Sequence, residues 1–145
     1  MAKLIFVNLP VSDIKRATAF YEAIGAVKNP QFSDETASCM VFSDTIHAML
    51  MTHDKYRYFT SKTIVDAKTS SQMLICISAD SREEVDDLVG KAMAAGGVID
   101  PSPQDDFSFM YGRSFEDPDG HMWGVNWMDL EAAAKAMAST DMARA

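Results

Sequence analysis

The stretch that decides the fold reads Phe115-Glu116-Asp117-Pro118-Asp119-Gly120-His121-Met122-Trp123-Gly124. Pro118 fixes its own φ near the value that a β-turn needs, and Gly120 tolerates the positive φ that often closes such a turn. The apolar and aromatic residues on both sides favour extended backbone. The stretch therefore predicts a tight turn that leads into a last strand, from Met122 to Met128.

Outward from this turn, hydrophobic periodicity predicts the same order of elements twice. The expected strands are residues 4–9, 27–32, 37–42, 46–52, 73–77, 98–99, 107–115 and 122–128. One helix is expected after the cap Ser12-Asp13, ending at Gly25, and another after the cap Ser81. The sequence thus predicts an α+β fold of two tandem β-α-β-β-β modules, residues 3–53 and 72–128, with a linker over 54–71 and a C-terminal helix over 129–140.

Composition limits the classes of function. The chain has 145 residues, a length that suits one compact domain. Its formal charge of −8 disfavours binding to nucleic acid and favours neutral or cationic small ligands. No apolar run approaches the ~18 residues of a membrane span, and no secretory signal pattern opens the chain. Cys39 and Cys76 lie in strand-like runs, which predicts two buried thiols in a reducing compartment. We therefore expect a cytoplasmic protein without membrane or nucleic-acid partners.

Two segments resemble the vicinal oxygen chelate superfamily, which includes glyoxalase I, bleomycin-resistance proteins and extradiol dioxygenases. One is the Asp-Pro-Asp-Gly turn, and the other is Val11-Ser12-Asp13-Ile14 followed by a helix that ends Ala19-Phe20-Tyr21-Glu22-Ala23-Ile24-Gly25. The resemblance spans residues 3–128. It implies that the two modules form a curved mixed sheet around a cleft, and that the chain is a homodimer, as many relatives are.

In that family a divalent ion is held in the cleft by side chains from the first and last strand of each module. Carried over by position, these ligands fall on Phe6, on Leu50 or Met51, on Leu74 and on Gly124. None of these side chains supplies the imidazole nitrogen or carboxylate oxygen that Zn, Ni, Mn or Fe(II) bind. The resemblance therefore implies a degenerate metal site and no cofactor.

Three histidines are the remaining candidates for a non-standard metal site, namely His47, His53 and His121. Strand alternation places His47 and His53 on one face of the fourth strand, but six residues of strand separate them by roughly 20 Å, too far to share an ion. A metal would have to pair one of them with His121. Otherwise His121 bonds to the loop, faces solvent or stands at the mouth of the cleft.

Without a metal, the wall of the implied cleft is apolar and sparsely polar. Its expected residues are Phe6, Asn8, His47, Met49, Met51, Leu74, Cys76, Met122, Gly124 and Asn126. The chain has eleven methionines, whose flexible thioethers suit either an adaptable pocket or the filling of core gaps. Trp123 and Trp127 alternate with Gly124 and are expected to pack under the helices.

Tyr111 and Arg113 are, with His121, the candidate catalytic residues. Their strand precedes the turn, so they could present a phenol and a guanidinium to a ligand, although a surface salt bridge for Arg113 is an equal alternative. Asp86 and Asp87 lie early in the second helix, where the macrodipole favours negative charge, and are expected to be solvated.

Three functions remain open. The leading hypothesis is a metal-independent binding protein of the bleomycin-resistance kind that sequesters an apolar or cationic small molecule. The alternative is a metal-dependent glyoxalase-type lyase or isomerase, similar to lactoylglutathione lyase, or a dioxygenase, with a non-standard ligand set. A third is an interaction module whose cleft is filled by Phe6 and methionines.

Overall fold

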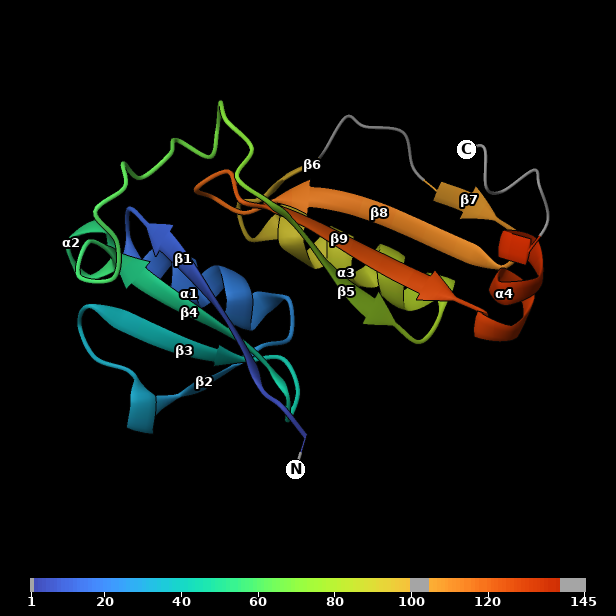
Figure 1. The fold of residues 1–145 in the computed structure, drawn as a ribbon, viewed down its shortest axis with the longest axis horizontal. Coiled ribbons are helices and arrows are strands. Elements are labelled where there is room, and N and C mark those ends of the chain that lie inside the picture. Colours follow the sequence, from blue (N-terminus) through green and yellow to red (C-terminus); the bar gives the residue numbers. More distant parts are fainter. Residues whose placement is uncertain (1, 100–104, 139–145) are drawn as a thin grey trace.

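The computed structural model describes residues 2–99 and 105–138, which form two mixed sheets side by side (Figure 1). The first module contains β1 (Ile5–Val11), α1 (Ile14–Ala23), β2 (Val27–Asn29), the 3-10 helix η1 (Pro30–Phe32), β3 (Ala37–Val41) and β4 (Ile46–Thr52), and is followed by α2 (His53–Tyr56). The second contains β5 (Leu74–Ala79), α3 (Arg82–Ala94), β6 (Val98–Ile99), β7 (Asp105–Phe107), β8 (Met110–Glu116) and β9 (Met122–Met128), and is followed by α4 (Leu130–Ala138). The predicted α+β fold of two β-α-β-β-β modules is confirmed.

The two sheets share one topology. The strand orders are β1-β4-β3-β2 and β5-β9-β8-β6, and the first strand of each module pairs in parallel with the last. The register places Phe6 opposite His47 in one module and Cys76 opposite Gly124 in the other. β1 and β5 are therefore edge strands, each with one side unpaired among the described strands.

The helices cover one face of each sheet and join the two modules in a common core. Asp13 caps α1 by accepting from the amides of Lys15 and Arg16, and Ser81 caps α3 in the same way. Both helices lie behind the sheets in Figure 1. Phe20 of α1 packs against Phe115 of β8, so apolar burial holds the modules together.

Three predicted elements were wrong in detail. The strand expected over 107–115 is a hairpin, β7 and β8, joined at Ser108 and Phe109, where neither Gly nor Pro marks the turn. The strand expected over 27–32 stops at Asn29, because Pro30 has no amide hydrogen for the ladder and begins η1. His53 is not in β4, because the Thr52 hydroxyl caps the next helix and His53 opens it.

The other predictions concern the two cysteine thiols, the C-terminal helix and membrane spans. Cys39 is buried as expected, but Cys76 is exposed, because β5 is an edge strand and Cys76 lies on the face without helices. Residues 139 and 140 of the expected C-terminal helix lie outside the described residues. Within the described ranges, no helix is long and apolar enough to cross a membrane.

Candidate functional site

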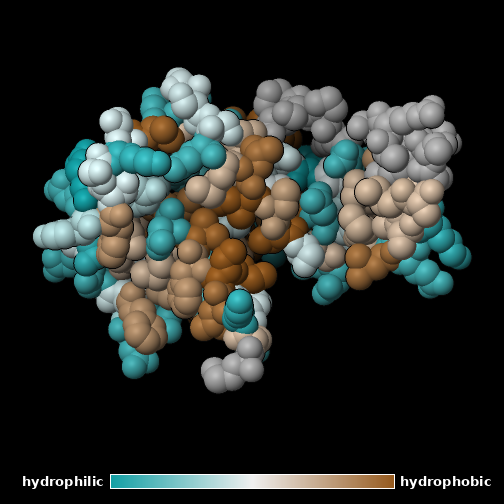
Figure 2. Space-filling model, viewed as in Figure 1, coloured by the Kyte–Doolittle hydropathy of each residue, from teal (hydrophilic) through white to brown (hydrophobic). Residues whose placement is uncertain are grey.

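The ten residues expected to line the cleft all lie on the sheet faces turned away from α1 and α3. We call these the open faces: Phe6, Asn8, His47, Met49 and Met51 in the first module, and Leu74, Cys76, Met122, Gly124 and Asn126 in the second. Figure 2 shows hydrophobic residues gathered over the middle of this view, between the modules. Phe6 is 48% exposed and Leu74 is 70% exposed, so apolar surface remains uncovered in the single chain.

The open face of the first module carries an aromatic pair. The rings of Phe6 and His47 are stacked, with centroids 4.6 Å apart and planes at 17°. The edge of the His47 ring also faces the Ile5 carbonyl, whose oxygen lies 3.3 Å from Nδ1. The stack presents a flat, apolar surface at this point of the face.

In the second module, a thiol lies over Gly124. A Cβ added at Gly124 would lie 2.9 Å from Cys76 Sγ, so a side chain at this position would require Cys76 to move. The open face here is therefore shaped by the pair of an exposed cysteine and a glycine.

Tyr111 and Arg113 do not lie on the open faces. They point toward α3, where both bond to Asp86: the phenol donates at 2.7 Å and Arg113 Nη1 donates at 3.1 Å. The Tyr111 hydrogen bond, followed by Arg113, lowers the pKa of Asp86, and the same bond raises the pKa of Tyr111. The salt-bridge alternative for Arg113 is the one that the structure adopts, and Asp86 is paired rather than simply solvated.

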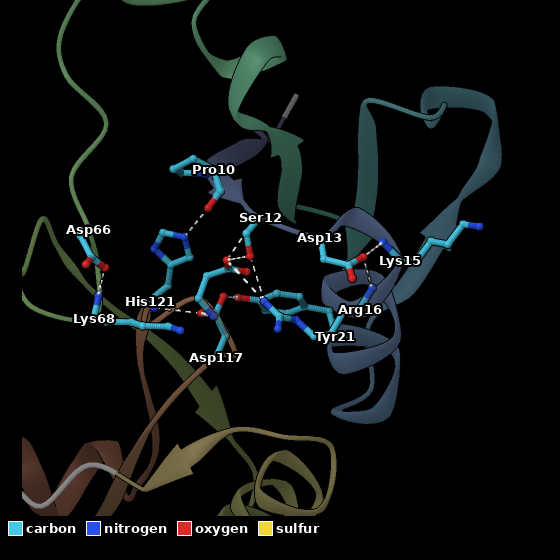
Figure 3. A network of polar contacts seen from close by, with 11 residues as sticks. Pro10, Ser12, Asp13, Lys15, Arg16, Tyr21, Asp66, Lys68, Asp117 and His121 are labelled. Atoms are coloured by element: carbon cyan, nitrogen blue, oxygen red, sulfur yellow. Dashed lines mark hydrogen bonds and ion pairs between the residues drawn. The ribbon is translucent and has the colours of Figure 1, made fainter.

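A buried polar network joins the modules instead (Figure 3). Tyr21 donates its hydroxyl proton to Asp117 Oδ2 at 2.5 Å, and Trp123 Nε1 donates to the Tyr21 oxygen at 2.9 Å. Burial raises the pKa of Asp117, and burial together with the Asp117 charge raises the pKa of Tyr21 well above its ordinary value. This network fixes α1 of the first module to the turn and β9 of the second.

The turn makes further contacts to the end of β1. His121 donates its backbone N–H to Asp117 Oδ1 at 2.8 Å, and its ring Nε2 donates to the Pro10 carbonyl at 2.7 Å. Asp119 Oδ1 accepts from both the amide and the hydroxyl of Ser12. His121 is thus 8% exposed and bonds across to the first module.

Sequence reasoning missed Asp117 and Asp119, which it treated only as turn residues. A partial signal was present, because a phenol on the apolar face of a helix needs a hydrogen-bond partner when buried. Tyr21 is such a residue, but its partner lies 96 positions along the chain. The local sequence pattern could therefore show that Tyr21 needs a hydrogen-bond partner, but it could not show which residue that partner is.

A cavity of about 330 Å³ lies beside these contacts, and we call it the junction cavity. Its polar wall consists of Ser12, His53, Asp66, Lys68, Asp119 and His121, and its apolar wall of Pro10, Ile64, Val65 and Ala67. Gly120 lets the linker approach, because a Cβ there would lie 2.6 Å from the Lys68 amide nitrogen, and its φ is +94°. His53 and His121 therefore share one cavity, whereas His47 lies on an open face.

A family model matches residues 3–125, and it describes the Glyoxalase/Bleomycin resistance protein/Dioxygenase superfamily. The chain belongs to this superfamily. The match covers both modules and confirms the resemblance seen in the turn and the first helix. A search of curated protein sequences found no match.

Several solved structures share the fold. A hypothetical protein from S. aureus is 25% identical with a TM-score of 0.71, over 88% of this chain and 95% of that one. A glyoxalase/bleomycin resistance protein/dioxygenase family enzyme from Burkholderia phytofirmans PsJN is 23% identical with a TM-score of 0.73, over 88% and 99%. The fosfomycin resistance protein FosX from Listeria monocytogenes is 20% identical with a TM-score of 0.63, over 90% and 97%.

The positions carried over for the superfamily's metal do not fit a metal ion. Phe6 and Leu74 are exposed hydrocarbons, Gly124 has no side chain, and on the fourth strand Met51 is on the open face while Leu50 is in the core. Among residues 2–99 and 105–138, no group of three or more His, Cys, Asp or Glu is placed to hold a metal ion.

Proposed function

We propose that this chain is a small-molecule binding protein of the superfamily, which sequesters a flat apolar or cationic compound on its open faces without a metal at the usual positions. One observation carries the proposal: where a metal ligand would stand, the chain has Phe6, half exposed and stacked on His47. An exposed aromatic stack gives a planar ligand a face to bind, and it offers a metal no donor.

Charge and chemistry support the same class of ligand. The net charge of −8 attracts cations to the protein, and a cation over an aromatic face gains further electrostatic attraction. Met49 and Met122 add polarizable, flexible side chains to the open faces, which suits ligands of variable shape. The Listeria relative carries the name of a fosfomycin resistance protein, and defence against a small toxic compound is a role consistent with such a surface.

We also propose that the functional unit is a homodimer. β1 and β5 end their sheets with exposed apolar residues, including Ile5 at 55% and Leu74 at 70%. A second copy that covers these edges would remove apolar area from water and turn the open faces into the walls of a cleft. Light scattering after gel filtration should give twice the chain mass, and a monomer at micromolar concentration would contradict the dimer.

The test of the binding function is a titration with planar aromatic cations, acridine orange and ethidium, followed by fluorescence and thermal unfolding. Phe6→Ala should weaken binding by roughly fivefold, because an aromatic stacking contact contributes about 1 kcal/mol. Phe32→Ala is the matched control, since Phe32 is an exposed phenylalanine, 63% accessible, on η1. Equal loss in both variants, or no binding by the unchanged chain, would contradict the proposal.

Elemental analysis of the protein purified without chelator separates this proposal from the enzymatic alternative. We expect less than one equivalent of Zn, Ni, Mn or Fe per chain, even after incubation with each ion. A full equivalent that is lost in a His47, His53 or His121 variant would instead make a lyase, isomerase or dioxygenase the leading function.

A further inference from the structure

The junction cavity is built by four segments that are distant in sequence. They are the end of β1, the start of α2, the linker at residues 64–68 and the turn at residues 119–121. Its volume of about 330 Å³ is far larger than the roughly 30 Å³ that one water occupies in the liquid. None of the ten open-face residues named above lines it, although Pro10 follows Phe6 and Asn8 on the same face of β1, so this cavity adjoins the binding surface proposed above without sharing those residues.

Asp119 lines this cavity and has one carboxylate oxygen without a described partner. Its side chain is 10% exposed, and Oδ1 takes the hydrogen bonds from Ser12 and the ion pair with Arg16 at 3.8 Å. Oδ2 is buried and has no hydrogen-bond partner among the described residues. A carboxylate has two acceptor oxygens, and here only one of them accepts hydrogen bonds from described residues. Burying the other oxygen away from water without a donor costs free energy.

His121 contributes a second acceptor. Because a carbonyl only accepts, the bond to Pro10 requires that Nε2 carries the proton, which leaves Nδ1 with a free lone pair in the neutral ring. No residue in the part of the chain that the structure describes bonds to Nδ1. The exposed carboxylate of Asp66 adds negative charge to the same cavity and the Lys68 side chain adds a positive charge, and the apolar wall includes Ile64 and Val65.

We propose that the junction cavity binds a small primary ammonium compound with a short apolar body. The ammonium supplies three N–H donors, of which one reaches Asp119 Oδ2 and one reaches His121 Nδ1, while the hydrocarbon lies against Ile64 and Val65. Less than 1 Å² of Oδ2 is exposed, so the carboxylate has to rotate toward the ligand. That torsion is broad and nearly two-fold, but Oδ1 holds two hydrogen bonds from Ser12 and the ion pair with Arg16, so the rotation has to break or re-form these contacts and the ammonium has to offset that cost.

An organic cation fits better than a bare metal ion. No three ligating side chains converge anywhere in the described ranges, whereas an ammonium needs only two acceptors and an apolar contact. The requirement for N–H donors also gives the proposal a sharp discriminating probe, because a quaternary ammonium has the same charge and none of the donors.

The experiment is calorimetric titration of the full chain with n-butylammonium chloride, and with tetramethylammonium chloride at equal ionic strength. We expect n-butylammonium to bind at one site per chain, and tetramethylammonium to bind at least tenfold more weakly. Asp119→Asn should weaken n-butylammonium binding at least tenfold. Asp44→Asn, an equal change of net charge in the exposed turn between β3 and β4, should leave the affinity unchanged.

Two further readouts keep the test valid if Asp119→Asn fails to fold. Ala67→Leu fills the cavity from its apolar wall and should abolish n-butylammonium binding while cooperative unfolding is retained. In the unchanged chain, n-butylammonium should shift the ¹⁵N resonance of His121 Nδ1. Equal binding of both ammonium ions, no binding of either, or an affinity unaffected by Ala67→Leu would each overturn the proposal, whatever the titrations at Phe6 show.

Discussion

Two tyrosine–aspartate hydrogen bonds stand in this chain in opposite environments. Tyr21 donates to Asp117 at 2.5 Å in the core between the modules, and Tyr111 donates to Asp86 at 2.7 Å on the surface of the second module. Asp117 is 1% exposed, whereas the Asp86 side chain is 55% exposed. The same kind of hydrogen bond therefore holds the two modules together at Tyr21 and Asp117, and is a minor surface contact at Tyr111 and Asp86.

The pKa shifts of the two carboxyl groups have opposite signs for this reason. Burial dominates at Asp117 and raises its pKa, although the Tyr21 bond acts in the other direction. At Asp86 the hydrogen bond from Tyr111 dominates, and the pKa falls. A hydrogen bond alone thus does not set the charge state of an aspartate, because loss of hydration can outweigh it.

The largest expected effect comes from removing each carboxylate. Asp117→Ala leaves two buried donors, the Tyr21 hydroxyl and the His121 amide, and the part-buried amide of Asp119 without their acceptor, and should cost about 3 kcal/mol or more of unfolding free energy. Asp86→Ala should cost about 0.5 kcal/mol or less, because exposed pairs contribute little. Urea unfolding at one protein concentration measures both, and equal losses would show that the burial difference has no energetic weight.

A finer comparison removes only the two hydroxyl groups. Tyr21→Phe leaves a buried carboxylate oxygen and the Trp123 N–H without partners, and should lower the unfolding free energy by about 1–3 kcal/mol. Tyr111→Phe should change it by less than about 0.5 kcal/mol, since water replaces the phenol at Asp86. The same urea experiment measures both variants. A larger loss of unfolding free energy in Tyr111→Phe than in Tyr21→Phe would contradict the conclusion that Tyr21 stabilises the contact between the modules.

The pH dependence of stability should separate the pairs by sign. The folded pKa of Asp117 is raised above 3.8, so the unfolded chain loses this proton first, and the stabilising contribution present at lower pH is lost as pH rises through the folded value. The folded pKa of Asp86 is lowered, so its contribution is present above 3.8 and is lost as pH falls through the folded value.

Unfolding curves between about pH 3 and pH 7 test both signs. The unchanged chain should lose stability as pH rises above the ordinary aspartate value, and Asp117→Asn should remove that loss. The unchanged chain should also lose stability at the acid end of the range, and Asp86→Asn should remove that second loss. Matching slopes in the two variants would contradict the opposite shifts.

The contrast between the pairs also marks how far sequence reasoning reached. β9 was predicted with its observed bounds, and so was the strand over residues 46–52 apart from the placement of His53 on it, because turn residues bound the alternating pattern on both sides. The expected packing of Trp123 under the helices is confirmed, since it is 2% exposed and alternates with Gly124 along the strand. Such features depend on neighbours within a few residues.

The junction could not be predicted in the same way. Its contacts join Ser12 to Asp119 and Pro10 to His121, 107 and 111 positions apart, and they form only when the two modules pack. The hairpin at Ser108 was missed for a different reason, because its turn has no Gly or Pro. Strand alternation placed the open-face residues on the correct side, but whether a second chain covers them is a property of assembly and not of local pattern.

The smallest expected effect concerns Arg113, the second donor to Asp86. Its side chain is 20% exposed and its Nε is buried with no described partner, so the gain from the ion pair is offset by lost hydration. Arg113→Met should therefore change the unfolding free energy by less than about 0.5 kcal/mol. The pKa of Asp86 should rise toward its ordinary value yet stay below it, because the Tyr111 hydrogen bond is the larger cause of the shift. Titration of the Asp86 carboxyl carbon by NMR measures this directly, and a complete return to the ordinary value would show that the guanidinium, rather than the phenol, sets the charge state of the exposed pair.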